Sequence, residues 1–491
     1  MAVFIFIYLL VMLSTLIFLP LFGAFLLFFI SSERLYLIRF ISVIVSIETF
    51  FLSLFLWFLF DKSTSEFQFC EIYYWSYQEI FLGIDGISLF LIILTTFLIP
   101  LCILTNWNNS VFFKEYVISF LIIEGFLIFI FSILDLLMFY IFFESVLIPM
   151  FLIIGLGGSG RRKVRSSYFF FFYTLVGSAL MLLSIIFIYI NVGTLNYQIL
   201  SSIYFNESIQ YFLWIAFMVA FMSKIPMVPF HIWLPEAHVE APTGGSVLLA
   251  GVLLKLGTYG ILRFLLPLFP LGTLYYLPLM YSLTGISIIY TSGTAIRQTD
   301  LKRVIAYTSI AHMNLVVIAL FVLNLISVEG AIFQMLSHGI VSSALFFCIG
   351  FYYDRYNTRI IENFGGSVQF LPLLSFFFFI FTLANLAFPC TCNFVGEFIM
   401  LVGIFNENSF VAFLSSLGMV LSGAYSLWIY NRVCFGNIKL IFVKDLNRFE
   451  FIILFILFFF TILFGIFPII LTDYMTFSIV NLINLINIKI L

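Results

Sequence analysis

The chain has 491 residues, of which 64% are hydrophobic and 9% carry a charged side chain. Water-soluble domains are about 45–50% apolar and about 25% charged, so this composition excludes a soluble globular protein. The net charge is −2 at pH 7, and the sequence has no basic run long enough to follow a phosphate backbone. Nothing in it therefore supports nucleic-acid binding.

Long apolar runs predict an all-α polytopic membrane protein. A membrane-crossing helix needs about 20 apolar residues, and windows of this length predict about 14 transmembrane helices. In chain order they cover approximately residues 4–30, 35–60, 85–106, 112–133, 136–156, 166–191, 209–230, 242–266, 273–295, 301–323, 328–353, 371–404, 409–431 and 450–472. The polar stretches 61–84 and 192–210 are expected to be loops, and a tail follows the last helix. No Lys or Arg precedes Arg34, so the first helix is expected to belong to the mature protein.

The basic residues predict the orientation of these helices. Most of the 21 Lys and Arg residues fall in loops that follow odd-numbered helices, whereas the other side holds Lys62, Arg263 and Lys489. The positive-inside rule places the basic loops on the cytoplasmic or matrix side and both termini opposite. Two further lysines, Lys224 and Lys255, fall inside predicted helices.

Several ionisable residues lie inside the predicted helices, where each charge costs about 2.5–3.5 kcal/mol. They are Glu48, Glu124, Glu144, Lys224, Lys255, His312, His338 and Glu397. One interpretation is structural, with Glu144 and Lys224 forming a buried pair. The other is a proton path, since burial shifts Lys and Glu toward their neutral forms and histidine suits a relay. Lys, His and Glu on neighbouring helices favour the proton path.

Prolines predict breaks in two of the helices. Pro226 and Pro229 follow Lys224 in the seventh, and Pro389 precedes Glu397 in the twelfth. Irregular backbone at membrane depth is tolerated only when it is buried in protein or lines a wet cavity, and it often marks an ion site. The two breaks lie five helices apart, which predicts inverted five-helix repeats formed by helices 4–8 and 9–13. The expected regions are 1–110, 111–268, 269–433 and 434–491.

Other motifs give weaker indications. G-L-G-G-S-G at 155–160 has the letters of a dinucleotide fingerprint but no preceding strand, so a basic loop is expected. His231 and His238, with Glu236 and Glu240, fit no common zinc spacing. Cys390 and Cys392 are expected to be small packed side chains rather than redox or metal ligands. The sequence thus predicts no metal and no bound cofactor.

Five segments together resemble subunit 4 of NADH–ubiquinone oxidoreductase, a membrane-arm chain of respiratory complex I. They are D-L-L-M-F-Y-I-F-F-E-S-V-L-I-P-M (135–150), K-I-P-M-V-P-F-H-I-W-L-P-E-A-H-V-E-A-P-T (224–243), G-V-L-L-K-L-G-T-Y-G-I-L-R (251–263), S-I-A-H-M-N (309–314) and F-V-G-E-F (394–398). The resemblance runs from about Asp85 to Arg432, and the second segment is highly specific.

The resemblance implies 14 helices with inverted repeats related to cation/proton antiporters. The family's proton-handling residues fall on Glu144, Lys224, Lys255 and Glu397, with His312 and His338 as relay members. Glu124 and Asp135 are accessory candidates. One departure is Cys390, which follows Pro389 where the family usually has glycine, and it puts the local backbone in question.

The resemblance also implies a function and a location. The chain is expected to pump protons across the mitochondrial inner membrane with its basic loops on the matrix side. NADH, FMN, iron–sulfur clusters and ubiquinone are then handled by other subunits, and subunits 2 and 5 are the expected neighbours. The expected transfer runs from the Glu144–Lys224 pair to Lys255, and then through His338 and His312 to Glu397.

Three alternatives remain open on the sequence alone. A stand-alone or Mrp-type cation/proton antiporter subunit would share the fold and the charges. A scaffold subunit would carry the charges only for assembly. A plastid relative of the same complex is the third, and the 69 Phe residues, whose codons are T-rich, favour mitochondria only weakly.

Overall fold

The computed structural model describes residues 12–75, 78–107, 112–158, 160, 162–437 and 443–490. The chain forms two compact units. The first comprises Met1–Lys224, Tyr259–Tyr275 and Asp473–Leu491, and the second comprises Ile225–Thr258 and Tyr276–Thr472. Three helices contribute residues to both units, namely α13 (Leu254–Gly260), α15 (Pro270–Arg297) and α23 (Ile469–Ile490).

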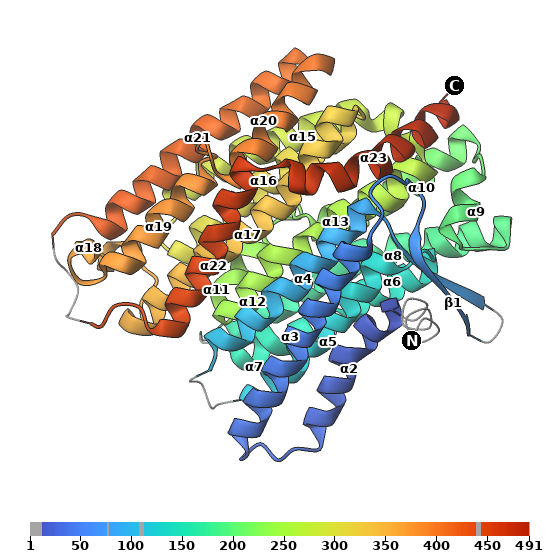
Figure 1. Ribbon diagram of the computed structural model, residues 1–491. Coiled ribbons are helices and arrows are strands. Elements are labelled where there is room, and N and C mark those ends of the chain that lie inside the picture. Colours follow the sequence, from blue (N-terminus) through green and yellow to red (C-terminus); the bar gives the residue numbers. More distant parts are fainter. Residues whose placement is uncertain are drawn as a thin grey trace. The chain divides into compact units, whose positions relative to one another are not determined.

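The first unit is a helical bundle with one β-hairpin. Its other elements are α2 (Met12–Phe28), α3 (Leu35–Leu59), β1 (Gln68–Trp75), β2 (Gln78–Ile84), α4 (Gly86–Thr105), α5 (Phe113–Ser132), α6 (Leu136–Ser145), α7 (Leu147–Gly157), α8 (Lys163–Val192), α9 (Tyr197–Ser202), α10 (Glu207–Lys224), the π-helix η2 (Ile261–Leu265) and α14 (Leu266–Leu268). Helices α2 to α5 lie side by side (Figure 1), and α5 packs against both α2 and α4.

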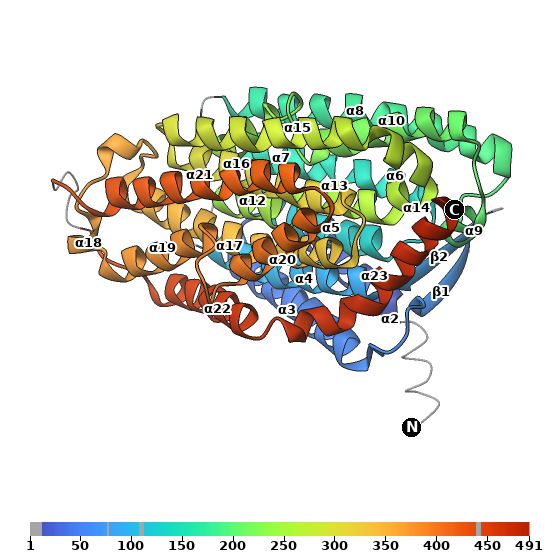
Figure 2. The same ribbon diagram turned by 90° about the horizontal axis from the view of Figure 1, so that it is seen from above.

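The second unit is helical throughout the part that the structure describes. Its other elements are α11 (Trp233–Glu240), α12 (Thr243–Leu248), the π-helix η1 (Leu249–Leu253), α16 (Leu301–Phe321), α17 (Leu325–Tyr356), the 3-10 helix η3 (Ile361–Asn363), α18 (Ser367–Phe370), α19 (Pro372–Asn385), α20 (Cys392–Glu407), α21 (Ser409–Cys434) and α22 (Arg448–Ile466). Helices α19, α20 and α21 run alongside one another (Figures 1 and 2).

Among the described residues, 11 helices are long and apolar enough to cross a membrane. Two shorter apolar helices, α2 and α19, match parts of the first and twelfth predicted helices. The start of the first predicted helix, residues 4–11, lies outside the described residues, as do Ser159 and Arg161 of the expected basic loop. The structure thus confirms a polytopic helical membrane protein.

The expected loop at 61–84 is wrong, because this stretch contains the antiparallel hairpin of β1 and β2. The hairpin holds a buried carboxylate, since the Glu71 side chain accepts hydrogen bonds from the Leu13 and Ser14 backbone N–H groups at 2.8 and 3.1 Å. These N–H groups belong to the first turn of α2, which has no intrahelical partner for them. The hairpin therefore anchors the start of α2.

The tail that was expected after residue 472 is instead part of the helix α23. Its most apolar window has a mean hydropathy of 1.6, the same as that of α21, so the sequence itself carried the signal for this helix. Tyr474 packs its ring edge-on against Trp57 and Phe90, and the Lys489 Nζ donates to the Pro267 carbonyl at 2.9 Å. Packing against the first unit therefore stabilises this helix.

Both helices that the sequence predicts to be broken are interrupted in the structure. Helix α10 ends at Lys224 and α11 begins at Trp233, with Pro226 and Pro229 in the interval. Helix α19 ends at Asn385 and α20 begins at Cys392, with Pro389 in the interval. Proline removes a helical N–H donor and clashes with the preceding turn, which explains both breaks.

Cys390 has a φ of 70°, which is the left-handed conformation that favours glycine. This is the position where the resembled family usually has glycine, and the break keeps the glycine-like backbone without it. The Cys390 carbonyl also lies directly against Gly465 of α22, where any side chain would clash. The strained backbone is thus held by close packing, at a cost of about 1–2 kcal/mol.

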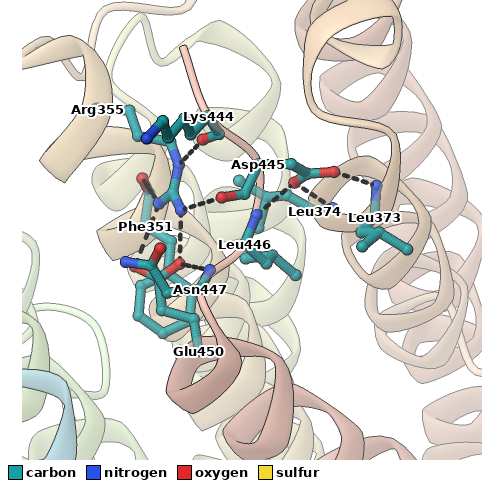
Figure 3. A network of polar contacts seen from close by, with 9 residues as sticks. All are labelled: Phe351, Arg355, Leu373, Leu374, Lys444, Asp445, Leu446, Asn447 and Glu450. Carbon is teal, nitrogen blue, oxygen red and sulfur yellow. Dashed lines mark hydrogen bonds and ion pairs between the residues drawn. The ribbon is translucent and has the colours of Figure 1, made fainter.

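A polar network joins three helices of the second unit (Figure 3). The Arg355 guanidinium on α17 pairs with Glu450 of α22 at 2.5 Å and donates to the Asp445 carbonyl at 3.1 Å. The Asp445 carboxylate accepts from the Leu373 N–H in the first turn of α19 at 2.8 Å. Helix α17 carries His338, and α19 precedes the second helix break. The network therefore holds together helices that carry or adjoin predicted site residues.

Candidate functional site

The first group of predicted residues lies in the first unit, at the ends of α6 and α10. The Lys224 Nζ donates to the Phe143 carbonyl at 3.2 Å and lies 4.3 Å from the centroid of the Phe143 ring. Lys224 is 5% exposed. A buried ammonium over an aromatic face gains about 2 kcal/mol from the ring quadrupole. Phe143 therefore holds this lysine in place.

Glu144 follows Phe143, and its two carboxylate oxygens are buried. Neither oxygen meets hydrogen-bond geometry with a described residue, although the Ser178 hydroxyl acts on the carboxylate. The ion pairs in that part of the chain do not include Glu144 with Lys224. The two residues still act on each other electrostatically. The predicted pair is thus adjacent but not closed as an ion pair.

The second group lies in the second unit and begins at Lys255 in α13. Lys255 is fully buried. Its Nζ lies 3.0 Å from the His338 Nδ1 and also donates to the Ala250 carbonyl. Ala250 belongs to η1, where π-helical geometry widens the turn and leaves carbonyls available, as is common at functional sites. The π-helix therefore supplies one of the two partners of this lysine.

His312 on α16 and Glu397 on α20 form the other end of the second group. The His312 Nδ1 lies 2.8 Å from the Glu397 Oε1. The same oxygen accepts from the Gln334 Nε2 on α17 at 3.3 Å, and Gln334 in turn accepts from the Ser337 hydroxyl at 3.0 Å. The carboxylate is thus held by groups from two further helices.

Gly396 permits this arrangement, because a side chain at that position would collide with Gln334. The glycine lets α17 and α20 approach closely, as small residues do between membrane helices. Close approach brings Gln334 within reach of Glu397.

A gap between two imidazole rings separates the two ends of the second group. The centroids of the His312 and His338 rings lie 5.8 Å apart, and the Nε2 atom of each ring has no partner among the described residues. The two rings thus share no direct hydrogen bond. The structure therefore arranges four predicted residues, Lys255, His338, His312 and Glu397, in one row.

The two accessory candidates occupy different surroundings. Glu124 on α5 is fully buried and accepts from the Thr49 hydroxyl at 2.6 Å, with one oxygen left without a partner among the described residues. Asp135 accepts from the Met138 N–H at 2.9 Å and caps α6. Burial raises the pKa of the Asp135 carboxyl, while the Met138 and Leu137 N–H groups oppose this shift. The contacts of Asp135 are those of a helix cap.

Two residues of the His–Glu motif differ in their contacts, since Glu236 has an ion-pair partner whereas neither ring nitrogen of His238 has a hydrogen-bond partner among the described residues. Glu236 pairs with Arg303 at 2.8 Å, and the His238 ring stacks on Phe346 at a centroid distance of 4.6 Å. The described part of the chain holds no group of three or more His, Cys, Asp or Glu residues arranged for a metal ion. Glu48, by contrast, is exposed on α3.

Arg263, which the charge count assigned to the side opposite the basic loops, lies inside the first unit. It is 4% exposed, and its Nη2 lies 2.6 Å from the Asp85 Oδ1. The guanidinium also lies over the rings of Phe67, Tyr197 and Tyr259. This pair is fully satisfied and closed, unlike Glu144 and Lys224.

Sequence reasoning missed three residues that touch the site, namely Phe143, Gln334 and Tyr425. Gln334 lies four residues before His338 on α17, so helical spacing places both on one face. That spacing is the signal that could have found it. An aromatic ring in a Phe-rich helix gives no comparable signal.

Comparison with known proteins places the chain among membrane subunits of respiratory enzymes. A family model described as NADH:quinone oxidoreductase/Mrp antiporter, TM, matches residues 134–414, which is more than half of the chain. The chain is 54% identical over 479 residues to NADH-ubiquinone oxidoreductase chain 4 of Marchantia polymorpha, covering 96% of this chain and 97% of that protein. It is 54% identical over 480 residues to the protein of the same name from Arabidopsis thaliana, with the same coverage.

Solved structures show the same similarity. A chain of respiratory complex I from Thermus thermophilus with bound NADH matches with a TM-score of 0.87 and 27% identity, covering 96% of this chain and 99% of that one. A chain of the Mrp complex from Dietzia sp. matches with a TM-score of 0.86 and 17% identity, covering 96% and 98%. The second likeness concerns the fold alone.

Proposed function

The chain belongs to the family of NADH-ubiquinone oxidoreductase chain 4, a proton-pumping membrane subunit of respiratory complex I, and from this premise we propose which of its residues carry the protons. The carriers are Lys224, switched by Glu144, and the row Lys255, His338, His312 and Glu397. The observation that supports this assignment most is the pair of direct contacts at the two ends of the row, 3.0 Å for Lys255–His338 and 2.8 Å for His312–Glu397.

In the first unit, the proposed switch is the contact between Glu144 and Lys224. A buried carboxylate without an ion-pair partner is unfavourable, and closing the ion pair would satisfy both charges. In the structure the Lys224 ammonium group instead donates to the Phe143 carbonyl and lies over the Phe143 ring. Closing the pair would hold a proton on Lys224, and opening it would favour release.

In the second unit, the row conducts by proton hops between fixed groups. A proton that leaves Lys255 can be taken by the His338 Nδ1, and one that reaches the His312 Nδ1 can be taken by the Glu397 carboxylate. Imidazole exchanges protons near neutral pH, which suits both middle positions. Moving one charge against 100 mV requires about 2.3 kcal/mol, which electron transfer elsewhere in the complex supplies.

The finer architecture is part of the same proposal. The chain has about 14 transmembrane helices, with inverted repeats formed by helices 4–8 and 9–13 and bounded near residues 111, 268 and 433. The breaks at Pro226, Pro229 and Pro389 are the corresponding irregular segments of the two repeats. Support comes from the position of Lys224 and of Glu397 beside these two breaks.

The proposed setting of the subunit rests on analogy with its relatives. The chain lies in the mitochondrial inner membrane with its basic loops in the matrix, and subunits 2 and 5 are its neighbours. NADH, FMN, iron–sulfur clusters and ubiquinone bind other subunits, so this chain moves protons without a redox centre of its own. Blue native electrophoresis of solubilised membranes tests this setting, since the chain must migrate in the large NADH-oxidising band.

Replacement of Lys224 tests the proposed function. In the purified complex reconstituted into liposomes, Lys224→Ala should lower proton uptake per NADH, and in a tightly coupled enzyme NADH oxidation as well. Lys62→Ala is the matched control, because Lys62 is an exposed lysine of the same unit that pairs with Asp473. Normal pumping and oxidation in the Lys224 variant would refute the assignment.

A further inference from the structure

A small cavity adjoins the Glu397 end of the proton row. Its volume is about 10 Å³, and it lies among α15, α16, α20 and α21 of the second unit. Its polar lining consists of His312, Glu397, Ser415, Ser422 and Tyr425. A space of this size is about that of one water molecule.

Two buried polar atoms of this lining have no partner among the residues described, namely the Tyr425 hydroxyl and the His312 Nε2. Tyr425 is 1% exposed and His312 is 5% exposed. A hydroxyl buried without a hydrogen bond is unfavourable, and buried polar groups are nearly always paired with protein or with ordered water. These orphaned atoms therefore indicate a water in the cavity.

The serines of the lining leave room for that water. The Ser415 hydroxyl donates to the Ala412 carbonyl at 2.8 Å, and the Ser422 hydroxyl donates to the Met419 carbonyl at 2.6 Å. Each hydroxyl therefore donates its hydrogen bond within α21, and the lone pairs of its oxygen can still accept one. A water in the cavity thus has both donors and acceptors around it, as a stably bound water needs.

The lining residues that α21 contributes lie on one face of that helix. Ser415, Ser422 and Tyr425 follow one another at helical spacing, so they share one face of α21. From Ser415 to Tyr425 this face extends about 15 Å along the helix. These three residues therefore form one polar face of α21 that lines the same cavity as Glu397.

We propose that this cavity binds one water molecule, held by the Tyr425 hydroxyl, and that this water exchanges protons with Glu397. When Glu397 releases its proton, the carboxyl O–H bond breaks and an O–H bond forms on the water. The water passes one of its own protons to solvent, so it is regenerated and no other bond changes. Tyr425 is a positioning residue in this step, and the inference rests on the proposed proton row.

The test uses the complete purified complex in liposomes, with Tyr425→Phe as the main variant. This change keeps the ring and removes only the hydroxyl. The rate of proton uptake should fall about three- to tenfold, which corresponds to the loss of one hydrogen bond in the transfer step. Tyr430→Phe is the matched control, because Tyr430 is a half-buried tyrosine on the same helix that packs against Phe378 and Phe379, and it should pump as the unaltered complex does.

Infrared difference spectroscopy supplies a readout that a purely structural role would not move. The bands of the Glu397 carboxyl group are identified by their loss in Glu397→Gln, and they should shift in Tyr425→Phe but not in Tyr430→Phe. A second variant, Ser422→Val, fills the cavity and should reproduce the effect of Tyr425→Phe on both pumping and the bands.

Two results would overturn the inference in different ways. If Tyr425→Phe and Ser422→Val both match Tyr430→Phe while Lys255→Met and Glu397→Gln lose pumping, the water is not part of the path and the proton row stands. If Lys255→Met and Glu397→Gln also pump normally, the proton row is wrong, and the role of this water is overturned with it.

Discussion

The two units hold their membrane-buried charges in different ways. In the first unit, Lys224 contacts Phe143 and leaves both oxygens of Glu144 without an ion-pair partner among the described residues. In the second unit, Lys255 contacts His338 directly and Glu397 contacts His312 directly. The Glu144–Lys224 pair has two alternative arrangements, open and closed. At both ends of the row, by contrast, each residue already contacts its partner. We infer that the first arrangement suits a switch and the second suits conduction.

A third set of residues shows what a structural charge pair looks like in the same chain. Asp85 and Arg263 are buried, joined at 2.6 Å and surrounded by three aromatic rings. Such a pair has no unsatisfied group and no second partner to move to. The contrast with Glu144 and Lys224 is what we propose to distinguish a charge pair kept for stability from one that takes part in proton transfer.

The largest expected effect comes from breaking the row at its first member. Lys255→Met removes the charged group but keeps the length of an apolar side chain. Loss of a positioned proton carrier typically costs at least about a hundredfold in rate, so the rate of proton transfer through this chain should fall by that order. The control is Lys62→Met at an exposed lysine, which should leave uptake unchanged. Pumping within twofold of the unaltered complex in Lys255→Met would show that the row does not conduct.

The next effect concerns stability rather than pumping. Asp85→Asn leaves Arg263 charged and buried without its partner, which should cost about 3–5 kcal/mol. Thermal dissociation of the purified complex, followed by the loss of this chain from it, measures the change. The double variant Asp85→Asn with Arg263→Met should recover much of the loss. If Asp85→Asn dissociates at the normal temperature, the pair is not the structural element described here.

A smaller effect tests the switch in the first unit. Phe143→Leu removes the ring under Lys224, and the lost cation–π attraction should bias the lysine toward Glu144. Proton uptake should then fall about thirtyfold, the factor that about 2 kcal/mol corresponds to, because a closed pair releases its proton less readily. Phe142→Leu serves as the control, since the Phe142 ring packs on Phe126 and Phe129 instead. Equal proton uptake in the two variants would show that Phe143 is not part of the switch.

The smallest effect lies at the second helix break. Cys390→Gly should stabilise the chain by about 1 kcal/mol, because glycine adopts the observed left-handed backbone without strain. Cys392→Gly is the opposite control, since Cys392 begins the regular helix α20 and glycine weakens helices. Thermal dissociation of the complex compares the two. Destabilisation by Cys390→Gly would mean that the cysteine side chain contributes more than its backbone costs.

Much of the site could be predicted from the sequence because charges stand out in apolar helices. Lys224, Lys255 and Glu397 are conspicuous for that reason, and the nearby prolines mark the helix breaks on their own. Hydropathy could not show that the Lys224 ammonium group contacts Phe143 rather than forming an ion pair with Glu144. That choice depends on how α6 and α10 pack, which no local pattern encodes.

The uncharged residues that contact the site could not be predicted from the sequence, for a similar reason. Gln334 and Tyr425 touch the Glu397 region only because α17 and α21 pack around α20 there. Many polar residues of this chain do no more than bond to their own helix, so composition cannot distinguish the two kinds. The hairpin of β1 and β2 was missed because a search for apolar windows treats any polar stretch as a loop.

The measurement that tests the central claim most directly is a double-variant cycle across the row. Proton uptake per NADH is compared for Lys255→Met, Glu397→Gln and the double variant in reconstituted complex. If the two residues act on one path, the double variant should pump no worse than the more severe single variant, since one break already stops the transfer. If the two losses multiply instead, Lys255 and Glu397 act independently, and the continuous row from one to the other is wrong.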